Sequence, residues 1–275
     1  MKSKSDKTGL NKWQEIALFP VVQGTLLGAF TIFSITPLLN WTNCKMNNQK
    51  MNWNKPLAGW RAYTSSAAPS YAAVFALKLL FPSTPDDSFV YNFSTSFTAG
   101  ALAGLAGVPS EVIAQNQHLA KLETGSETVK KMKSSNGYGS FFKGGGATML
   151  REGMWSTTYL TSVPGLAHYL QQKGMEKNTA QATAVVTTSV PYAVLSTPFH
   201  LFRSKKQFGL TAPINTPSYV QIGKKIWNED LSASTFQRLS FLFRGARERT
   251  VTVLIATILM VKGEEHYTKM IRSMK

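Results

Sequence analysis

Arg151 and Glu152 form a charged pair at the start of a long uncharged stretch. Residues 153–172 contain no Asp, Glu, Lys or Arg, and a stretch of this length can cross a bilayer as a helix. A charge near the bilayer centre costs roughly 2.5 to 3.5 kcal/mol, so both side chains should face protein or water. A guanidinium holds a carboxylate or phosphate through two parallel hydrogen bonds. We therefore expect Arg151 to line a cavity, unless the pair only marks the solvated end of the helix.

The remaining sequence offers little covalent or metal chemistry. It contains no P-loop, dinucleotide-binding glycine motif, zinc-protease motif or Ser-His-Asp arrangement. The four histidines, at positions 118, 168, 200 and 266, do not have metal-ligand spacing. Cys44 is the single cysteine, which excludes an internal disulfide. We expect a protein that is not an enzyme and has no cofactor and no metal.

Six stretches lack charged residues, and each could hold one membrane helix: 16–44, 62–77, 88–110, 153–172, 178–202 and 250–261. The sequence therefore predicts an all-α membrane protein with six transmembrane helices. Two pairs of glycines four residues apart, Gly24 with Gly28 and Gly100 with Gly104, predict close helix approach. Four tryptophans are expected to anchor helix ends at the membrane interface: Trp53, Trp60, Trp155 and Trp227.

The net charge of +16 is unevenly distributed. Most of it falls in the connections 41–61, 111–152 and 203–249. Basic loops stay on one side of a membrane, so these connections should share a compartment and both termini should lie opposite. The competing interpretation is nucleic-acid binding, which would need a basic helix stripe or a known motif. The sequence shows neither, so we expect no nucleic-acid partner.

The first, third and fifth stretches each contain a proline near their C-terminal end, namely Pro37, Pro109 and Pro198. Each proline should kink or stop its helix, and each is followed by a basic connection and another uncharged stretch. This pattern is an internal threefold repeat. It divides the chain into a flexible N-terminal head (1–14), three repeats (15–82, 88–172 and 178–268) and a C-terminal tail (269–275). The head is Lys-rich and shows no secretory signal pattern.

The repeat resembles the mitochondrial carrier family over most of residues 16–268. The segment 198–207, PFHLFRSKKQ, is similar to the family signature Pro, any, acidic, any, any, basic, any, basic, any, Gln, and departs from it at His200. The second copy keeps Glu111 but has Ala114 in the basic position, and the first keeps only Pro37. In this family an aromatic-basic-Gly turn precedes the second, fourth and sixth membrane helices. The segments 142–144 and 243–245 resemble this turn, and 57–59 is a degenerate copy of it. The acidic-basic motif at the far ends of the even helices is reduced to Glu265.

The resemblance implies three pseudo-symmetric two-helix repeats and roles for particular residues. The matrix gate would be closed by three pairs: Leu39 with Ala114, Glu111 with Arg203, and His200 with Thr42. Only one of these is ionic, which predicts a weak gate or one closed partly by packing. The implied substrate-binding residues are Ser66, Arg151, Glu152, Arg249 and Thr252. The helix starts would bind a membrane lipid such as cardiolipin, through Phe142, Lys143, Gly144, Phe243, Arg244 and Gly245.

The resemblance leaves the substrate open. The basic surplus favours a small anionic solute, above all a nucleotide such as ATP, exchanged across the mitochondrial inner membrane by a monomer. An Arg followed by an acid at positions 151 and 152 resembles the amino-acid carriers instead. The missing gate charges also suit a carrier fold that serves as a scaffold or adaptor. The degenerate repeats and Lys/Asn-rich connections resemble divergent family members that intracellular bacteria deliver into host cells.

Overall fold

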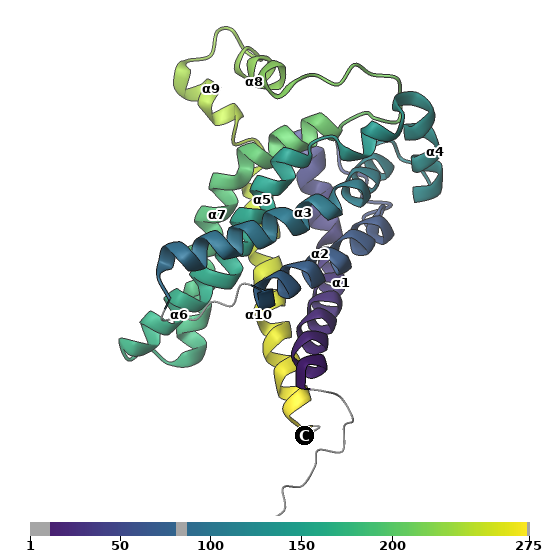
Figure 1. Cartoon of the computed structure of the whole chain (residues 1–275). Coiled ribbons are helices and arrows are strands. Elements are labelled where there is room, and N and C mark those ends of the chain that lie inside the picture. The colour runs from purple at the N-terminus through teal and green to yellow at the C-terminus, as the bar shows by residue number, and fades with distance from the viewer. Residues whose placement is uncertain (1–11, 81–86, 274–275) are drawn as a thin grey trace, which may run out of the picture.

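The computed structural model describes residues 12–80 and 87–273 (Figure 1). These residues form ten α-helices and no strand: α1 (Lys12–Met46), α2 (Trp60–Leu80), α3 (Phe89–Leu119), α4 (Gly125–Asn136), α5 (Gly145–Thr157), α6 (Val163–Gln172), α7 (Lys177–Gln207), α8 (Tyr219–Trp227), α9 (Thr235–Phe241) and α10 (Ala246–Ser273). A 3-10 turn, η1 (Tyr138–Phe142), precedes α5, and a π-turn, η2 (Thr158–Ser162), joins α5 to α6. The all-helical expectation is confirmed for the described residues.

The long helices pack as a closed series. Helix α1 packs on α2, α2 on α3, α3 on α5, the α5–α6 segment on α7, α7 on α10, and α10 on α1. The shorter helices α4, α8 and α9 lie at the same end of this bundle, with α4 on the other side from α8 and α9, and α10 ends at the opposite end (Figure 1). The basic connections are thus gathered at one end, as the charge distribution predicts.

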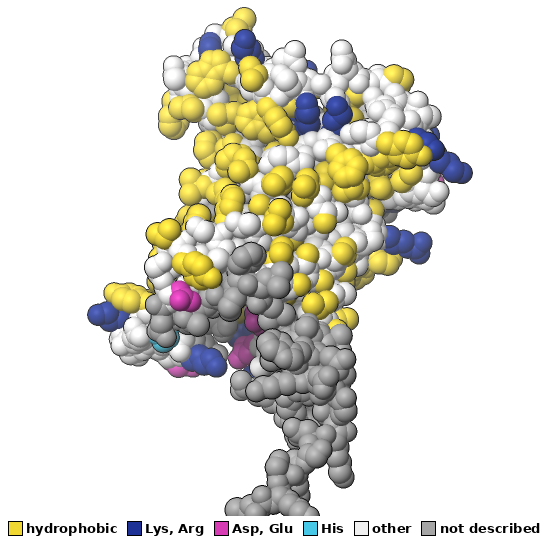
Figure 2. Space-filling model, in the orientation of Figure 1, with side chains coloured by type: hydrophobic (Ala, Val, Ile, Leu, Met, Phe, Trp, Pro, Cys, Tyr) yellow, Lys and Arg dark blue, Asp and Glu magenta, His cyan; other side chains and the backbone are white. Residues whose placement is uncertain are grey.

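The outer face of the bundle is largely apolar. Figure 2 shows hydrophobic side chains spread over the middle of this face, with Lys and Arg toward its two ends. Phe30, Leu102 and Leu195 on α1, α3 and α7 are 57%, 49% and 62% exposed. An apolar surface of this extent is typical of a protein that contacts lipid or a partner. By length and composition, two described helical segments could span a membrane, Val21–Met46 and Phe89–Leu119. The other four expected spans are not identified by this criterion.

Glycines permit the close helix contacts that the sequence predicts. A Cβ added at Gly28 would lie 2.5 Å from the Tyr71 ring, and one at Gly24 would lie 2.6 Å from the Phe75 ring. A Cβ at Gly100 would lie 2.5 Å from the Glu152 carbonyl oxygen, and one at Gly104 would lie 2.7 Å from the Glu152 side chain. The contact of α3 with α5 therefore requires glycine, and it places the Arg151–Glu152 pair on the inner side of the bundle.

The prolines do not stop their helices. Helices α1, α3 and α7 continue past Pro37, Pro109 and Pro198 to Met46, Leu119 and Gln207. A proline removes one backbone hydrogen bond, and a buried helix packed on its neighbours tolerates that loss. Pro164 has a local effect, because it has no N–H to donate to the carbonyl four residues earlier. There the chain forms the π-turn, in which the Val163 N–H donates to the Thr158 carbonyl.

Two expected boundaries differ from the structure. Residues 12–14, assigned to the flexible head, belong to α1, while residues 1–11 lie outside the described part of the chain. Residues 269–273, assigned to the tail, continue α10, while 274–275 lie outside it. Charged residues at these ends mark helix ends rather than the absence of helix, since a helix can extend beyond its uncharged core.

Candidate functional site

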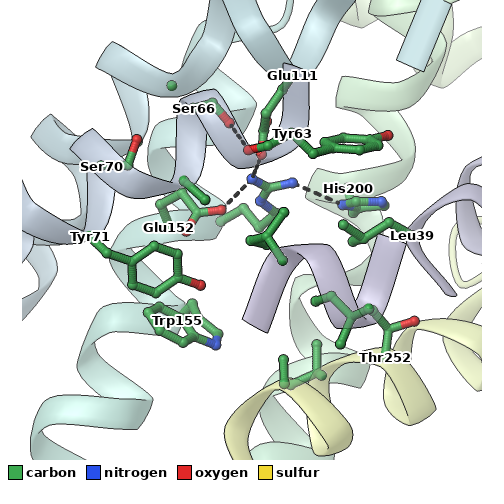
Figure 3. Close-up of a pocket in the computed structure, with 18 of the residues that line it drawn as sticks. Leu39, Tyr63, Ser66, Ser70, Tyr71, Glu111, Glu152, Trp155, His200 and Thr252 are labelled. Carbon is green, nitrogen blue, oxygen red and sulfur yellow. Dashed lines mark hydrogen bonds and ion pairs between the residues drawn. The ribbon is translucent and has the colours of Figure 1, made fainter. Parts of the chain in front are cut away.

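A small cavity of about 100 Å³ lies at the centre of the bundle (Figure 3). It is lined by side chains from all six long helical segments. All five residues that the sequence assigns to substrate binding line it, namely Ser66, Arg151, Glu152, Arg249 and Thr252. Of the six expected gate residues, the cavity is lined by Leu39, Glu111, His200 and Arg203. The fold thus brings most of the candidate residues to one place.

Arg151 is buried and holds two carboxylates. Its Nη2 donates to Glu111 Oε1 at 2.6 Å and also pairs with Glu152. Its Nη1 lies 3.4 Å from His200 Nδ1, and Figure 3 shows Glu111, Glu152 and His200 facing the same part of the cavity. The Arg151 backbone is also fixed, because the Tyr192 hydroxyl donates to its carbonyl oxygen at 3.1 Å. Glu152 thus pairs with Arg151 in this conformation, and Glu111 is a second carboxylate partner.

The expected Glu111–Arg203 ion pair is present. Arg203 Nη1 lies 2.5 Å from Glu111 Oε2, and the Arg203 side chain is only 2% exposed. Glu111 therefore uses one oxygen for Arg203 of α7 and the other for Arg151 of α5. One carboxylate is therefore shared by Arg203, its expected gate partner, and Arg151, an expected substrate-binding residue, and the sequence does not predict this sharing.

His200 lies among three arginines. Its Nδ1 lies 3.4 Å from Arg151 Nη1 and 3.1 Å from Arg249 Nη1, and its Nε2 lies 3.4 Å from Arg203 Nη2. A guanidinium can only donate, and a neutral imidazole accepts at one nitrogen only. The site that the family signature fills with a carboxylate therefore compensates none of these three charges.

Arg249 has no carboxylate within ion-pair distance among the described residues. It is 5% exposed, and Nη2 donates to Ser196 Oγ at 2.8 Å and to the Tyr192 hydroxyl at 3.2 Å. The guanidinium also lies over the Tyr192 ring, 5.6 Å from its centroid. The charged groups lining the cavity are three arginines and two glutamates. A buried cation with only neutral partners favours the arrival of an anion.

The residues of the other two expected gate pairs have the following neighbours in the structure. Thr42 contacts Thr252, with their hydroxyl oxygens 3.2 Å apart, whereas His200 is held by the arginines. Ala114 is buried beside the turn at Gly59, where an added Cβ would lie 2.7 Å from the Ala114 carbonyl oxygen. Leu39 lines the cavity instead. The two non-ionic gate pairs stay a prediction.

The expected lipid-binding turns share one backbone conformation. Gly59, Gly144 and Gly245 have φ of +81°, +82° and +83°, a left-handed conformation that favours glycine, and α2, α5 and α10 begin at the next residue. Phe142 is 61% exposed and Phe243 is 37% exposed, so both aromatic side chains are accessible. Arg244, however, is paired with Glu229. Lipid binding stays a prediction.

Aromatic residues that the sequence reasoning missed complete the cavity. Tyr63, Tyr71, Trp155 and Tyr192 line it, and Trp155 stacks edge-on against Tyr71 with ring centroids 5.2 Å apart. Trp155 is 8% exposed, so its assignment as an interface anchor is wrong. The signal was available, because residue 155 follows Arg151 by four positions and four positions in a helix return to the same face.

Comparison with known proteins supports the resemblance over part of the chain. Residues 85–174, about a third of the sequence, match the family model described as mitochondrial carrier protein. This segment contains α3, α4, α5 and α6, and with them Glu111, Arg151 and Glu152. A search of curated proteins found no significant match. The family match supports a solute-carrier function and a multi-pass membrane protein.

Proposed function

We propose that this protein is a six-helix membrane carrier that moves an anionic metabolite across the mitochondrial inner membrane by alternating access. The substrate we propose is a nucleotide such as ATP. The observation that carries the proposal is Arg249, a buried guanidinium on the cavity wall with only neutral hydrogen-bond partners among the described residues. An anionic group in the cavity would supply the missing counter-charge.

The three glycine turns support a threefold repeat. An added Cβ at Gly59 would meet α3 at Ala114, one at Gly144 would meet α7 at Gln207, and one at Gly245 would meet α1 at Met46. The second helix of each proposed repeat therefore begins against the C-terminal part of the first helix of the next repeat. The same contact made three times is consistent with pseudo-threefold packing, in which the gate lies where the three odd helices converge.

The shared carboxylate suggests how substrate would open the gate. An anion that binds Arg151 competes with Glu111 and Glu152 for the same guanidinium. Glu111 would then keep Arg203 as its only cationic partner, and the link between α3 and α5 would be lost. The cavity of about 100 Å³ is smaller than a typical small-molecule site of roughly 300 Å³ or more. Nucleotide binding thus requires the bundle to open, which that competition would favour.

The structure favours a nucleotide over an amino acid. An amino acid could place its ammonium group on Glu152 only after its carboxylate had displaced Glu152 from Arg151, and Arg249 would still lack a counter-charge. The uncompensated positive charge and the aromatic lining suit a molecule with phosphates and a base, because rings can stack on a base. The scaffold alternative is favoured only by the small number of gate ion pairs.

Transport by reconstituted protein tests the proposal. Purified protein would be placed in liposomes loaded with ATP or with a mixture of amino acids, and uptake of each labelled solute measured. We expect ATP exchange in the wild type, and a loss of about 10-fold or more in Arg249→Gln, since a hydrogen bond to a charged group contributes about 1.5–3 kcal/mol. The matched control is Arg61→Gln, an exposed arginine that does not line the cavity.

The other outcomes are distinct. Uptake of amino acids without ATP would establish the amino-acid alternative. If a cooperative thermal transition shows that the protein is folded and neither solute is transported, the scaffold alternative is favoured. Equal ATP exchange in Arg249→Gln and Arg61→Gln would remove the observation on which the nucleotide proposal rests.

A further inference from the structure

A second, larger groove lies at the end of the bundle that carries α8. It has a volume of about 640 Å³, within the range of small-molecule sites. It is formed by the C-terminal ends of α1 and α7, by α8, and by the turn before α10. Neither Arg151 nor any other residue of the central cavity lines it, so it is a separate site.

The cationic wall of the groove has an uncompensated charge. Lys205, Lys225 and Arg244 line it together with a single carboxylate, Glu229. Glu229 is committed to Arg244, whose Nη2 lies 2.5 Å from Glu229 Oε2, and it also accepts from the Asn48 amide at 3.3 Å. Lys205 is half-buried, and neither lysine has a carboxylate within ion-pair distance among the described residues. The two lysines are available to an anion.

The groove is also lined by apolar side chains. Ile222 and Ile226 are each 4% exposed and pack with Met46 and Leu201 in one cluster. Phe208 and Ile214 also line the groove and are 36% and 37% exposed. The apolar side chains would gain from contact with an apolar group, and the two ammonium groups would gain from an anion. Neither water nor an inorganic anion provides both. A ligand with both an apolar portion and an anionic group would do so.

Local hydrogen bonds hold the walls of the groove in place. Ser218 and Gln221 form a capping box at the start of α8, which fixes the helix that carries Lys225. The Lys206 ammonium donates to the Pro217 carbonyl, which holds the preceding loop against the end of α7. A pre-formed site loses less conformational entropy when it binds its ligand.

We propose that this groove binds a small amphipathic organic anion. Its phosphate or carboxylate would lie between Lys205 and Lys225, and its apolar portion would lie against Ile222 and Ile226. The ligand could be a soluble organic phosphate or the anionic end of a lipid, which share this chemistry. The proposal does not depend on transport through the central cavity.

Thiol protection tests the proposal at the site itself. Cys44 is 2% exposed, so a cysteine introduced at Asn228, an exposed residue on the groove, is the thiol that a maleimide reaches first. Labelling of Asn228→Cys would be timed with AMP, with short-chain dihexanoyl phosphatidic acid, and with inorganic phosphate. At ten times its dissociation constant a ligand leaves about a tenth of the sites free, so labelling should slow about 10-fold. Ser126→Cys on α4, outside the groove, should label at an unchanged rate.

Charge variants show whether the lysines hold the ligand. In the Asn228→Cys background, Lys205→Gln with Lys225→Gln should abolish protection, while Lys130→Gln with Lys224→Gln removes two exposed lysines outside the groove and should retain it. If the double variant does not fold, Lys225→Gln alone, on the surface of α8, should weaken protection several-fold.

Each outcome is informative. Protection by AMP alone identifies a soluble anion, and protection by the phosphatidic acid alone identifies a lipid. Unchanged labelling with both organic probes overturns the proposal. Equal protection by inorganic phosphate overturns the amphipathic class, since phosphate has no apolar portion.

Discussion

Glu111 and Arg151 form a buried ion pair of 2.6 Å that connects α3 to α5. The same carboxylate lies 2.5 Å from Arg203 of α7 through its second oxygen. Three helices are therefore held by one side chain, which is only 18% exposed. In the proposed carrier this carboxylate belongs to the gate, and Arg151 belongs to the substrate site. The proposed gate and the proposed substrate site are therefore coupled directly through the Glu111 carboxylate, without other side chains between them.

Replacing Glu111 should affect stability and transport together. In Glu111→Gln, Arg151 loses one of its two carboxylates and Arg203 is left buried without any. Breaking a buried ion pair costs about 3–5 kcal/mol, so the thermal transition should fall sharply. ATP exchange should also fall, and Glu111→Asp should restore part of both.

The control for this prediction is Glu127→Gln. Glu127 pairs with Lys131 one helical turn later on the exposed side of α4, and such pairs contribute about 0.3–0.5 kcal/mol. Wild-type stability and exchange in Glu111→Gln would show that the three-helix link is not important.

The glycine contact between α3 and α5 predicts opposite effects of the same substitution at two sites. In Gly100→Ala the new methyl group would lie 2.5 Å from the Glu152 carbonyl oxygen and 2.3 Å from the Ser156 Cβ, so the helices must move apart. Overpacking of this kind costs about 1–3 kcal/mol. In Gly146→Ala, on α5, the methyl group meets nothing within 4 Å, and the gain in helix propensity should stabilise by about 0.5–1 kcal/mol.

The measurement is the thermal transition of each purified variant in the same detergent. A lower transition for Gly100→Ala and an equal or higher one for Gly146→Ala is expected. Equal transitions for the two variants would contradict the close approach of α3 and α5.

The sequence predicts the site better than the contacts within it. The uncharged stretches locate the long helices, and the signature residues locate Glu111 and Arg203 as a pair. The sharing of Glu111 by Arg151 could not be predicted, because those two residues are on different helices and the pairing depends on how deep each helix sits. The three arginines around His200 are equally hidden, since they lie on α5, α7 and α10. The start of α1 and the end of α10 were predicted incorrectly, because charged residues there were placed outside the helices.

A hydrogen bond near the C-terminal end of the bundle predicts a stability effect without loss of packing. The Tyr159 hydroxyl of the π-turn donates to Glu264 Oε2 of α10 at 2.5 Å, while its ring stacks on Trp155 with centroids 5.3 Å apart. Tyr159→Phe keeps the ring and removes the donor. It should destabilise by about 1.5–3 kcal/mol, the usual contribution of a hydrogen bond to a charged group.

Tyr169→Phe is the matched control, because Tyr169 is 53% exposed, and it should leave the thermal transition nearly unchanged. Glu264→Gln combined with Tyr159→Phe should cost no more than either change alone if the two residues act through this hydrogen bond. Fully additive losses would show that they act separately.

Glu229 and Arg244 predict a pH dependence on the loop side. The Arg244 guanidinium donates to the Glu229 carboxylate, and this hydrogen bond lowers the pKa of Glu229 below its ordinary value of 4.5. A carboxyl with a lowered folded-state pKa stabilises the protein above its unfolded-state pKa, and that stability is lost as the pH falls through the folded-state pKa. Both groups are near the surface, so the contribution at neutral pH should stay below about 1 kcal/mol.

The measurement is the thermal transition of wild type and Glu229→Gln between neutral pH and a pH below the lowered folded-state pKa of Glu229. Wild type should be more stable at neutral pH, and the difference should disappear at the acidic end, where Glu229 is protonated in both states. In an Arg244→Gln background, Glu229→Gln should have little effect at any pH, because the cation that lowers the pKa is gone. A difference that grows as the pH falls would assign the stabilisation to the neutral carboxyl and contradict the ion pair.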